Sequence, residues 1–320
     1  MLKVAATPNQ TDDSPLALSG LEKSYANTRV LTRFDLKVAR GEVVALLGRN
    51  GAGKSTTVRL TVGLERPTAG TIRVFGYEPV EAAKRNLIGY CGQEVGIYPS
   101  RTLMENLVFF ARIAGKTLPD ALSAAKATAG LLGLKAHLER RSGDLSGGFK
   151  RRLHLGIALI GEAPLLVLDE PTAGVDVESR ELIIDLVRSL AEQGRGILYT
   201  SHDLTEVERL CDRVTILSRG TAQLSGTVRE LSETIGPLVR IEFEDRSDRE
   251  LARRSLTGSP RLWGSVGLDV QLQYGQSSAE TISVIQREGW KMRRFEVLAP
   301  GLEAMFLWAT RSEDEARDST

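Results

Sequence analysis

The feature that most constrains this chain is an apolar run followed at once by a glycine-rich loop. Val43–Leu47 is apolar throughout, and the residues from Gly48 to Ser55 read Gly-Arg-Asn-Gly-Ala-Gly-Lys-Ser. Glycines let the backbone fold tightly, so that successive N–H groups point at one anion, and the positive end of a following helix adds to this field. A chance glycine-rich turn is the alternative, but it leaves the strand before the loop and the helix-compatible run Lys54–Val62 after it unexplained. The pattern therefore predicts a phosphate-binding loop.

Nine residues of this segment are candidates to bind a nucleoside triphosphate: Gly48, Arg49, Asn50, Gly51, Ala52, Gly53, Lys54, Ser55 and Thr56. Lys54 can reach the β and γ phosphates, and the Ser55 hydroxyl can ligate Mg²⁺. A second apolar run, Leu165–Leu168, ends in Asp169 and Glu170. We expect Asp169 to hold Mg²⁺, directly or through water, and Glu170 to polarise the attacking water. The alternative for Glu170 is a surface residue that merely ends a strand.

Composition narrows the classes of protein to which the chain could belong. The 320 residues include 42 Lys+Arg and 41 Asp+Glu, a formal charge of +1, which argues against nucleic-acid binding through bulk positive charge. Cys91 and Cys211 form no disulfide framework or metal spacing, which favours a reducing, cytoplasmic location. The most apolar stretch, Leu155–Leu168, is too short for a membrane helix and is interrupted by Glu162 and Pro164. The N-terminal residues have no long apolar core, so no secretory signal is expected.

Changes in composition and hydrophobic pattern divide the chain into four parts. We expect a flexible arm over residues 1–14, an α/β domain over 15–226, a small α+β domain over 227–310 and a polar tail over 311–320. Continuous apolar runs predict buried strands, and spaced leucines predict a helix. In the first domain the predicted strands are Val43–Leu47, Leu165–Leu168, Ile197–Tyr199 and Val214–Leu217, and the predicted helix is Glu178–Ala191. In the second the predicted strands are Val239–Glu244 and Val266–Gln273, and the predicted helices are Ile282–Gly289 and Leu302–Thr310.

A third motif narrows the class to one family. Leu145–Phe149 reads Leu-Ser-Gly-Gly-Phe and opens a helix, which resembles the LSGGQ signature of ABC ATPases. Other segments resemble motifs of that family in the expected order: Gln93 the Q-loop glutamine, Ala173–Asp176 the D-loop in an altered form, His202 the switch histidine, and Tyr25 the aromatic residue that stacks on adenine. The resemblance covers about Leu16 to Gly226. It implies a P-loop NTPase fold with a helical subdomain, and ATP as the nucleotide.

The resemblance also implies a second anion site and a role for each motif residue. Ser146, Gly147 and Gly148 lie at a helix N-terminus, where unpaired N–H groups favour a phosphate. In the family two subunits close head to tail, and each signature contacts the γ-phosphate bound by the other. Gln93 is then expected to act on the water or the metal, His202 on the γ-phosphate and Asp176 across the dimer. For Tyr25 a core or surface tyrosine is the alternative.

Two features indicate which subgroup of ABC ATPases the chain resembles. Phe149 stands where the signature has Gln, and its ring cannot make the hydrogen bonds of an amide. The run Leu-Ser-Gly-Gly-apolar-Lys-Arg-Arg-Leu resembles ATPases of bacterial exporters for drugs, antibiotics, lipids or polysaccharides; the alternative is a degenerate, inactive site. The residues Ala299–Phe306 resemble the end of the small domain in those same subunits. Their alternative is a terminal amphipathic helix with a packing stripe of Leu302, Met305, Phe306 and Ala309.

The resulting functional prediction is the ATP-hydrolysing subunit of an exporter, located at the inner face of the cell membrane. Its expected partners are a separate membrane permease and a second ATPase subunit, either a copy or a relative, with no nucleic acid. An importer ATPase and a non-transport ABC switch remain alternatives. We expect the segment Glu94–Asn106, with Tyr98 and Leu103, to dock on the permease. The run Lys150–Arg152 is expected to be solvated or near phosphate, and His154 to face solvent.

Overall fold

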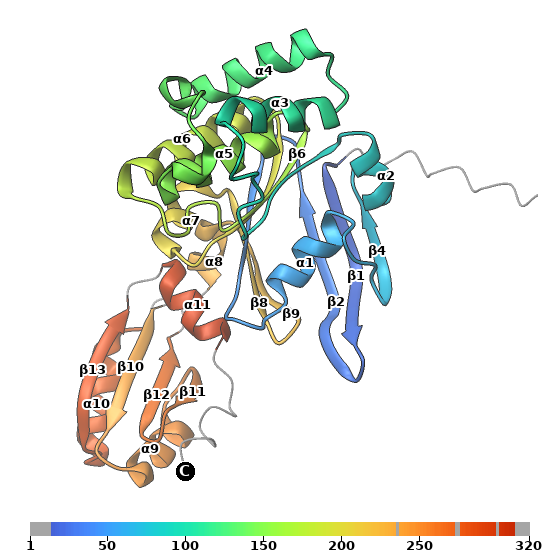
Figure 1. Cartoon of the computed structure of the whole chain (residues 1–320). Coiled ribbons are helices and arrows are strands. Elements are labelled where there is room, and N and C mark those ends of the chain that lie inside the picture. The colour runs from blue at the N-terminus through green and yellow to red at the C-terminus, as the bar shows by residue number, and fades with distance from the viewer. Residues whose placement is uncertain (1–13, 235–236, 273–275, 299–300, 311–320) are drawn as a thin grey trace, which may run out of the picture. The chain divides into compact units, whose positions relative to one another are not determined.

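The computed structural model describes residues 14–234, 237–272, 276–298 and 301–310 (Figure 1). The chain divides into two compact units: the first runs up to Arg213 and includes Arg219–Thr221, and the second comprises Val214–Ser218 and the residues from Ala222 on. The domain boundaries drawn from the sequence at residues 14, 226 and 310 stay predictions. Residues 1–13 of the predicted arm and the whole predicted tail lie outside the described residues.

The elements up to residue 226 alternate between strands and helices. In chain order they are β1 (Leu16–Tyr25), β2 (Thr28–Val38), β3 (Val43–Leu47), α1 (Lys54–Thr61), β4 (Ala69–Arg73), α2 (Pro79–Lys84), β5 (Ile88–Cys91), α3 (Leu103–Ile113), α4 (Leu118–Leu131), α5 (Gly147–Leu159), β6 (Leu165–Asp169), α6 (Val177–Glu192), β7 (Gly196–Thr200), α7 (Leu204–Leu210), β8 (Arg213–Ser218) and β9 (Thr221–Gly226), with short 3-10 turns at Lys135–His137 and Ser142–Asp144.

Two sheets are built from these strands. One is antiparallel, with the order β2-β1-β4, and the other has the order β5-β6-β7-β3-β8-β9. In the larger sheet β5, β6, β7 and β3 pair in parallel. Every residue of β3, β6 and β7 is buried, as the continuous apolar runs of the sequence predicted. Because parallel strands share a direction, the residues after β3, β6 and β7 gather at one edge of this sheet.

The helices α3, α4 and α5 form the predicted helical subdomain, and they lie together in Figure 1. A capping box fixes the start of α3: the Thr102 side chain accepts from the backbone of Glu105, and the Glu105 carboxylate accepts from the backbone of Thr102. The helix α5 packs against α3, α4 and α6 and also against β5. It is therefore covered on most sides, which matters for the residues that it carries.

The second unit contains a four-stranded antiparallel sheet. Its elements are α8 (Val228–Thr234), β10 (Leu238–Phe243), α9 (Arg246–Ser255), β11 (Ser259–Trp263), β12 (Gly267–Gln271), α10 (Ser278–Glu288), β13 (Met292–Leu298) and α11 (Leu302–Thr310). The sheet order is β11-β12-β10-β13. A β-α-β-β-α-β succession with this order is the ferredoxin-like topology. The predicted α+β character is confirmed, whereas α9, β11 and β13 were not predicted; Gln273, the predicted end of one strand, lies outside the described residues.

The two faces of this sheet differ in chemistry. One face packs Val239, Ile241 and Phe243 of β10 with apolar residues of α9 and α10. The other carries a row of alternating charge across the four strands: Arg261, Asp269, Arg240 and Glu296 are cross-strand neighbours in that order. Here α11 makes contact, because Arg261 donates to the Trp308 carbonyl and its guanidinium lies 3.9 Å from the centre of the Trp308 ring. In α11 the predicted stripe is confirmed for Leu302, Met305 and Ala309, which are buried, while Phe306 is half-buried.

Candidate active site

The phosphate loop connects β3 to α1. Gly51 has φ 79° and Gly53, the N-cap of α1, has φ 113°, conformations that side-chain-bearing residues rarely adopt. The Ala52 amide donates to the Arg49 carbonyl at 3.1 Å, which closes the turn. The helix then starts at Lys54, and its first N–H groups have no partner within the helix. This geometry places donors for an anion at the predicted position.

Lys54 lies within this loop. Its side chain is buried, and its ammonium donates to the carbonyls of Gly48 at 2.6 Å and Arg49 at 3.3 Å. Burial lowers the pKa of Lys54, and the nearby carboxylates of Glu170 and Asp169 oppose that shift. The lysine charge is thus held between the loop and the two predicted acids. Beside it Ser55 is exposed and Thr56 is buried.

Asp169 is the last residue of β6. It is buried, and its Oδ1 accepts a hydrogen bond of 2.6 Å from the Thr200 hydroxyl at the end of β7. Neighbouring parallel strands therefore orient the carboxylate. Its second oxygen, together with the Ser55 hydroxyl, provides hard oxygen donors of the kind that Mg²⁺ prefers, and two protein ligands are usual when phosphates and water complete the shell. The side chains present fit a magnesium ion bound with a nucleotide.

Glu170 follows Asp169 in an uncommon backbone conformation. Its φ is 52°, in the left-handed region, and its amide donates to the Thr200 carbonyl and hydroxyl at 3.1 and 3.0 Å. Its Oε1 lies 2.6 Å from Nε2 of His202, and the side chains of Glu170 and His202 are 13% and 51% exposed. A held backbone, a shielded carboxylate and a solvent-facing imidazole are thus brought together, while the roles predicted for Glu170 and His202 stay predictions.

The signature lies at the start of α5. Ser146 is its N-cap and accepts from the Phe149 amide at 3.5 Å; Ser146 and Gly147 are exposed, and Gly148 is buried. A Cβ on Gly148 would lie 2.6 Å from Oδ2 of Asp176 and 2.8 Å from Oγ of Ser179, so a larger residue there would displace these side chains. Asp176 in turn is the N-cap of α6. The signature and the D-loop residue are therefore in direct contact within one chain.

Asp176 is held by its own helix. Its carboxylate accepts from the Ser179 amide at 2.8 Å and from the Ser179 hydroxyl at 3.0 Å, and these hydrogen bonds lower its pKa. The side chain is exposed and charged beside the signature. Its predicted role across a dimer stays a prediction.

The apolar residue of the signature has partners within the chain. The Phe149 ring makes an edge-to-face contact with His137, with the centres 4.6 Å apart, and the Arg152 guanidinium lies 4.4 Å from its centre. Such contacts need a π face, which glutamine lacks. Phe149 is therefore a packing residue of the helical subdomain.

Gln93 and Tyr25 are two further side chains with predicted roles at the nucleotide site. Gln93 is exposed and follows Gly92 after β5, and its carbonyl accepts from Arg151 at 2.8 Å. Tyr25 ends β1 and is 38% exposed; its hydroxyl donates to Glu65, and the Lys23 ammonium lies 4.8 Å from the ring centre. Its predicted stacking on adenine stays a prediction.

Three expectations about α5 and its surroundings were wrong. Arg151, Arg152 and His154 are buried, not solvated, because α5 is covered by helices on one side and by β5 on the other. Burial lowers the pKa of His154 to about 4, and its Nδ1 lies 3.6 Å from Sγ of Cys91. Cys91 is buried, and Cys211 is partly buried. The basic run is thus structural, and Arg151 contacts the catalytic backbone, which no sequence pattern indicated.

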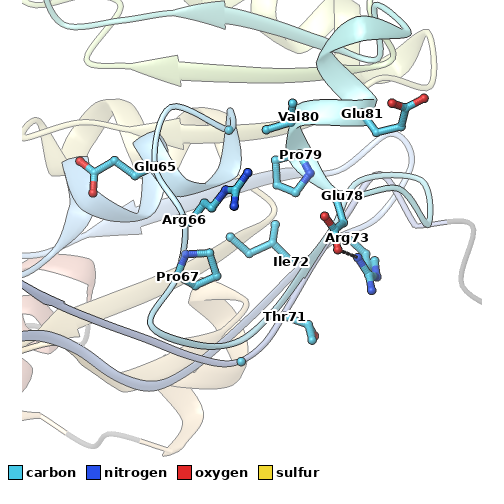
Figure 2. A pocket seen from close by; sticks show the side chains of 12 residues that line it. Glu65, Arg66, Pro67, Thr71, Ile72, Arg73, Glu78, Pro79, Val80 and Glu81 are labelled. Atoms are coloured by element: carbon cyan, nitrogen blue, oxygen red, sulfur yellow. Dashed lines mark ion pairs between the residues drawn. The ribbon is translucent and has the colours of Figure 1, made fainter. Parts of the chain in front are cut away.

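A separate pocket of about 490 Å³ lies between the end of α1, β4 and α2 (Figure 2). Its lining includes Pro67, Ile72 and Pro79 together with the ion pair of Arg73 and Glu78, whose charged atoms are 3.4 Å apart. The residues that line it are Gly63, Glu65, Arg66, Pro67, Gly70, Thr71, Ile72, Arg73, Glu78, Pro79, Val80 and Glu81. The pocket shares none of the predicted nucleotide residues.

A phosphate loop, two acids after another parallel strand of the same sheet and a glycine-started helix define an ABC-type ATPase. The chain belongs to the ABC transporter family: the family model described as "ABC transporter" matches residues 31–173. The fold and enzyme class predicted from the sequence are thereby confirmed. A solved structure described as the ATP binding subunit of an ABC transporter is similar with a TM-score of 0.64 and 30% identity, over 68% of this chain and 92% of that one.

Two relatives extend the comparison. The chain is 38% identical over 223 residues to "Linearmycin resistance ATP-binding protein LnrL" of Bacillus subtilis (strain 168), which is 69% of this chain and 72% of the relative. It is 32% identical over 314 residues to "Daunorubicin/doxorubicin resistance ATP-binding protein DrrA" of Streptomyces peucetius, which is 94% of this chain and 95% of the relative. The second match therefore extends through the C-terminal unit as well as the ATPase motifs.

Proposed function

We propose that this chain hydrolyses ATP as one half of a dimer of ATPase subunits and thereby drives a separate permease that exports a solute. The observation that carries the proposal is the grouping of the site residues. Lys54, Asp169 and Glu170 meet at one edge of the parallel sheet, and Gly147 lies exposed at the start of α5 near the Gly174 carbonyl of the D-loop. A site shared between two copies would use both groups, with two-fold symmetry.

Within such a site the residues of this chain have distinct tasks. The loop amides and Lys54 bind the phosphates, and Ser55 and Asp169 hold Mg²⁺, with Gln93 as a further ligand or water contact. When bound, Mg²⁺ neutralises charge that develops on the phosphates. Glu170 accepts a proton from the attacking water, and His202, at 2.6 Å from that carboxylate, orients it and is in reach of a γ-phosphate.

Export is the direction that the comparisons favour. The relatives carry names of drug resistance, and others are named Nod factor export ATP-binding protein I, one of them 35% identical over 93% of this chain. The chain is accordingly an exporter-type ATPase, and the importer alternative is not favoured. The solute and the identity of the second ATPase subunit are properties of the partners. We place the protein at the inner face of the membrane through its permease; no helix in the described ranges has the length and apolar character needed to cross a bilayer.

The surface proposed to contact the permease is an aromatic cluster after Gln93. Tyr98 is 44% exposed and packs edge-to-face on Phe109, with ring centres 5.0 Å apart. The buried Asn106 fixes its backbone, accepting from the Tyr98 amide at 2.8 Å and donating to its carbonyl at 3.1 Å. Leu103 is fully buried, which corrects its assignment to the docking surface. A charged residue substituted for Tyr98 therefore tests docking on the permease. A charged residue substituted for the buried Leu103 would instead disturb the packing of the core.

The test of the dimer uses the open space at Gly147. An added Cβ there comes no closer than 3.8 Å to its nearest neighbour, the Gly174 carbonyl, so Gly147→Asp adds a negative charge without strain in its own chain. In a Glu170→Gln background that retains ATP, we expect a dimer with ATP and Mg²⁺, and a monomer once Gly147→Asp is added. Gly147→Ala is the matched control and should dimerise. If the Glu170→Gln protein stays monomeric at high concentration and with its permease, the proposed function is wrong.

A further inference from the structure

The guanidinium of Arg151 is surrounded by backbone carbonyls. Its Nε donates to Pro171 at 3.0 Å, Nη1 to Gly92 at 3.0 Å and to Gln93 at 2.8 Å, and Nη2 to Asp169 at 2.9 Å and also to Glu170. An arginine has five N–H donors, and here five carbonyls accept from them. The side chain is 3% exposed.

This arrangement differs from an ordinary buried ion pair. Because each N–H group is already engaged by a carbonyl, none is left to form a charge-assisted bond with the Asp169 or Glu170 side chain. The two carboxylates stay available for metal and water, while the positive charge beside them is held by the backbone. The planar guanidinium of arginine can donate hydrogen bonds to carbonyls in several directions at once, which the compact ammonium of lysine cannot.

The five carbonyls belong to two segments that are distant in sequence. Gly92 and Gln93 begin the loop after β5, and Asp169, Glu170 and Pro171 form the turn after β6. The second segment includes the left-handed backbone of Glu170, a conformation that persists only when its surroundings hold it. Arg151 therefore connects the start of the Gln93 loop to the backbone of the proposed base through one rigid group.

We infer that Arg151 is the positioning residue that fixes the Glu170 carboxylate and the Gln93 loop relative to one another. The inference rests on the proposed function, in which Glu170 acts on the attacking water. A movement of the Gln93 loop is transmitted to the Glu170 turn through the shared guanidinium, without contact between the two side chains. Arg151 itself touches neither nucleotide nor water in this scheme.

The test separates positioning from binding. We expect Arg151→Met to lower kcat for ATP hydrolysis by about 10², the effect of displacing a catalytic group by roughly 1 Å, while the KM for ATP changes little. Arg151→Lys keeps the charge and part of the donor set. Its loss of kcat should therefore be about tenfold smaller than the loss in Arg151→Met. In a Glu170→Gln background, Arg151→Met should add almost nothing to the loss, because residues that act as a unit are non-additive.

A matched control is the next residue of the helix. Arg152 is also buried, but its Nη1 donates at 3.3 Å to the Leu132 carbonyl, away from both segments. Arg152→Met should lower the melting temperature like Arg151→Met, and leave kcat within about threefold of wild type.

Several outcomes would overturn the inference. The first is a wild-type kcat in folded Arg151→Met, and the second is a KM that rises as steeply as kcat falls. The third is a loss of kcat on Arg151→Met that is equal in the wild-type and Glu170→Gln backgrounds. Should Arg151→Met fail to fold, a wild-type kcat in Arg151→Lys has the same meaning. The proposed function fails by a different result, namely a normal turnover in Glu170→Gln alone.

Discussion

Nε2 of His202 lies 2.6 Å from Oε1 of Glu170, so the proposed base and the switch histidine are paired. Thr200 holds the Glu170 amide from β7, and Arg151 holds its carbonyl from α5. The backbone of the proposed base is therefore held from two elements, which is the preorganisation that efficient proton transfer needs.

The first prediction concerns the base. Glu170→Gln keeps the shape of the side chain and removes its basicity, so turnover should fall by about 10²–10⁴ while ATP binding is retained. Phosphate release and equilibrium ATP binding measure the two effects. Glu181→Gln, on the exposed side of α6 in an ion pair with Arg209, is the control and should turn over normally. Near-normal turnover in Glu170→Gln would remove this residue from the proposed role.

The second prediction concerns the phosphate charge. Lys54→Met preserves the length of the buried stem and removes the ammonium that now bonds to the loop carbonyls. Charge-assisted hydrogen bonds of about 1.5–3 kcal/mol would be lost, so ATP affinity should fall about 10- to 100-fold. Calorimetric titration with ATP measures it. Lys84→Met, at an exposed position of α2, should bind as wild type does; equal affinities in all three proteins would exclude Lys54 from phosphate binding.

The third prediction concerns the altered signature. Phe149→Gln restores the residue of the resembling motif but loses the ring contacts with His137 and Arg152. We expect a loss of about 1 kcal/mol in the free energy of unfolding and a turnover within a few-fold of wild type. Denaturant unfolding and phosphate release are the measurements. A large rise in turnover would show that the phenylalanine limits catalysis.

The fourth prediction concerns pH. Burial lowers the pKa of His154 to about 4, whereas the pKa of a histidine in an unfolded chain is near its ordinary value of 6.5. Between these values the unfolded chain binds the proton and the folded chain does not, so stability falls as the pH falls through this range. The contribution is at most about 1.4 kcal/mol per pH unit. His154→Gln should flatten the dependence of unfolding free energy on pH between 4 and 6.5; an unchanged slope would assign it to other groups.

The sequence predicted what local patterns encode. The loop from Gly48 to Ser55 and the acids after β6 follow directly on buried apolar strands. The helix α6 occurs where leucine spacing placed it, and α11 occupies the predicted range Leu302–Thr310. The edge of the sheet where these residues meet follows from parallel pairing alone.

What the sequence could not predict depends on non-local packing. Arg151 and His154 look solvent-facing in a helix-wheel argument, but α5 is enclosed by three other helices and β5. The carbonyls that accept from Arg151 come from residues 58 and 59, and 18 to 20, positions away in the chain. β13 carries Arg293 and Arg294 in place of a clear alternation, so its strand character depends on pairing with β10.

The position of β10 has a consequence for how the protein is made. This strand is the first of its sheet to emerge from the ribosome, yet its two neighbours, β12 and β13, are synthesised later. The sheet cannot be complete until residue 298 has left the exit tunnel. Until β12 and β13 are made, β10 therefore has both edges unpaired and its apolar side uncovered, a state in which a nascent chain is prone to aggregate and a chaperone can protect it.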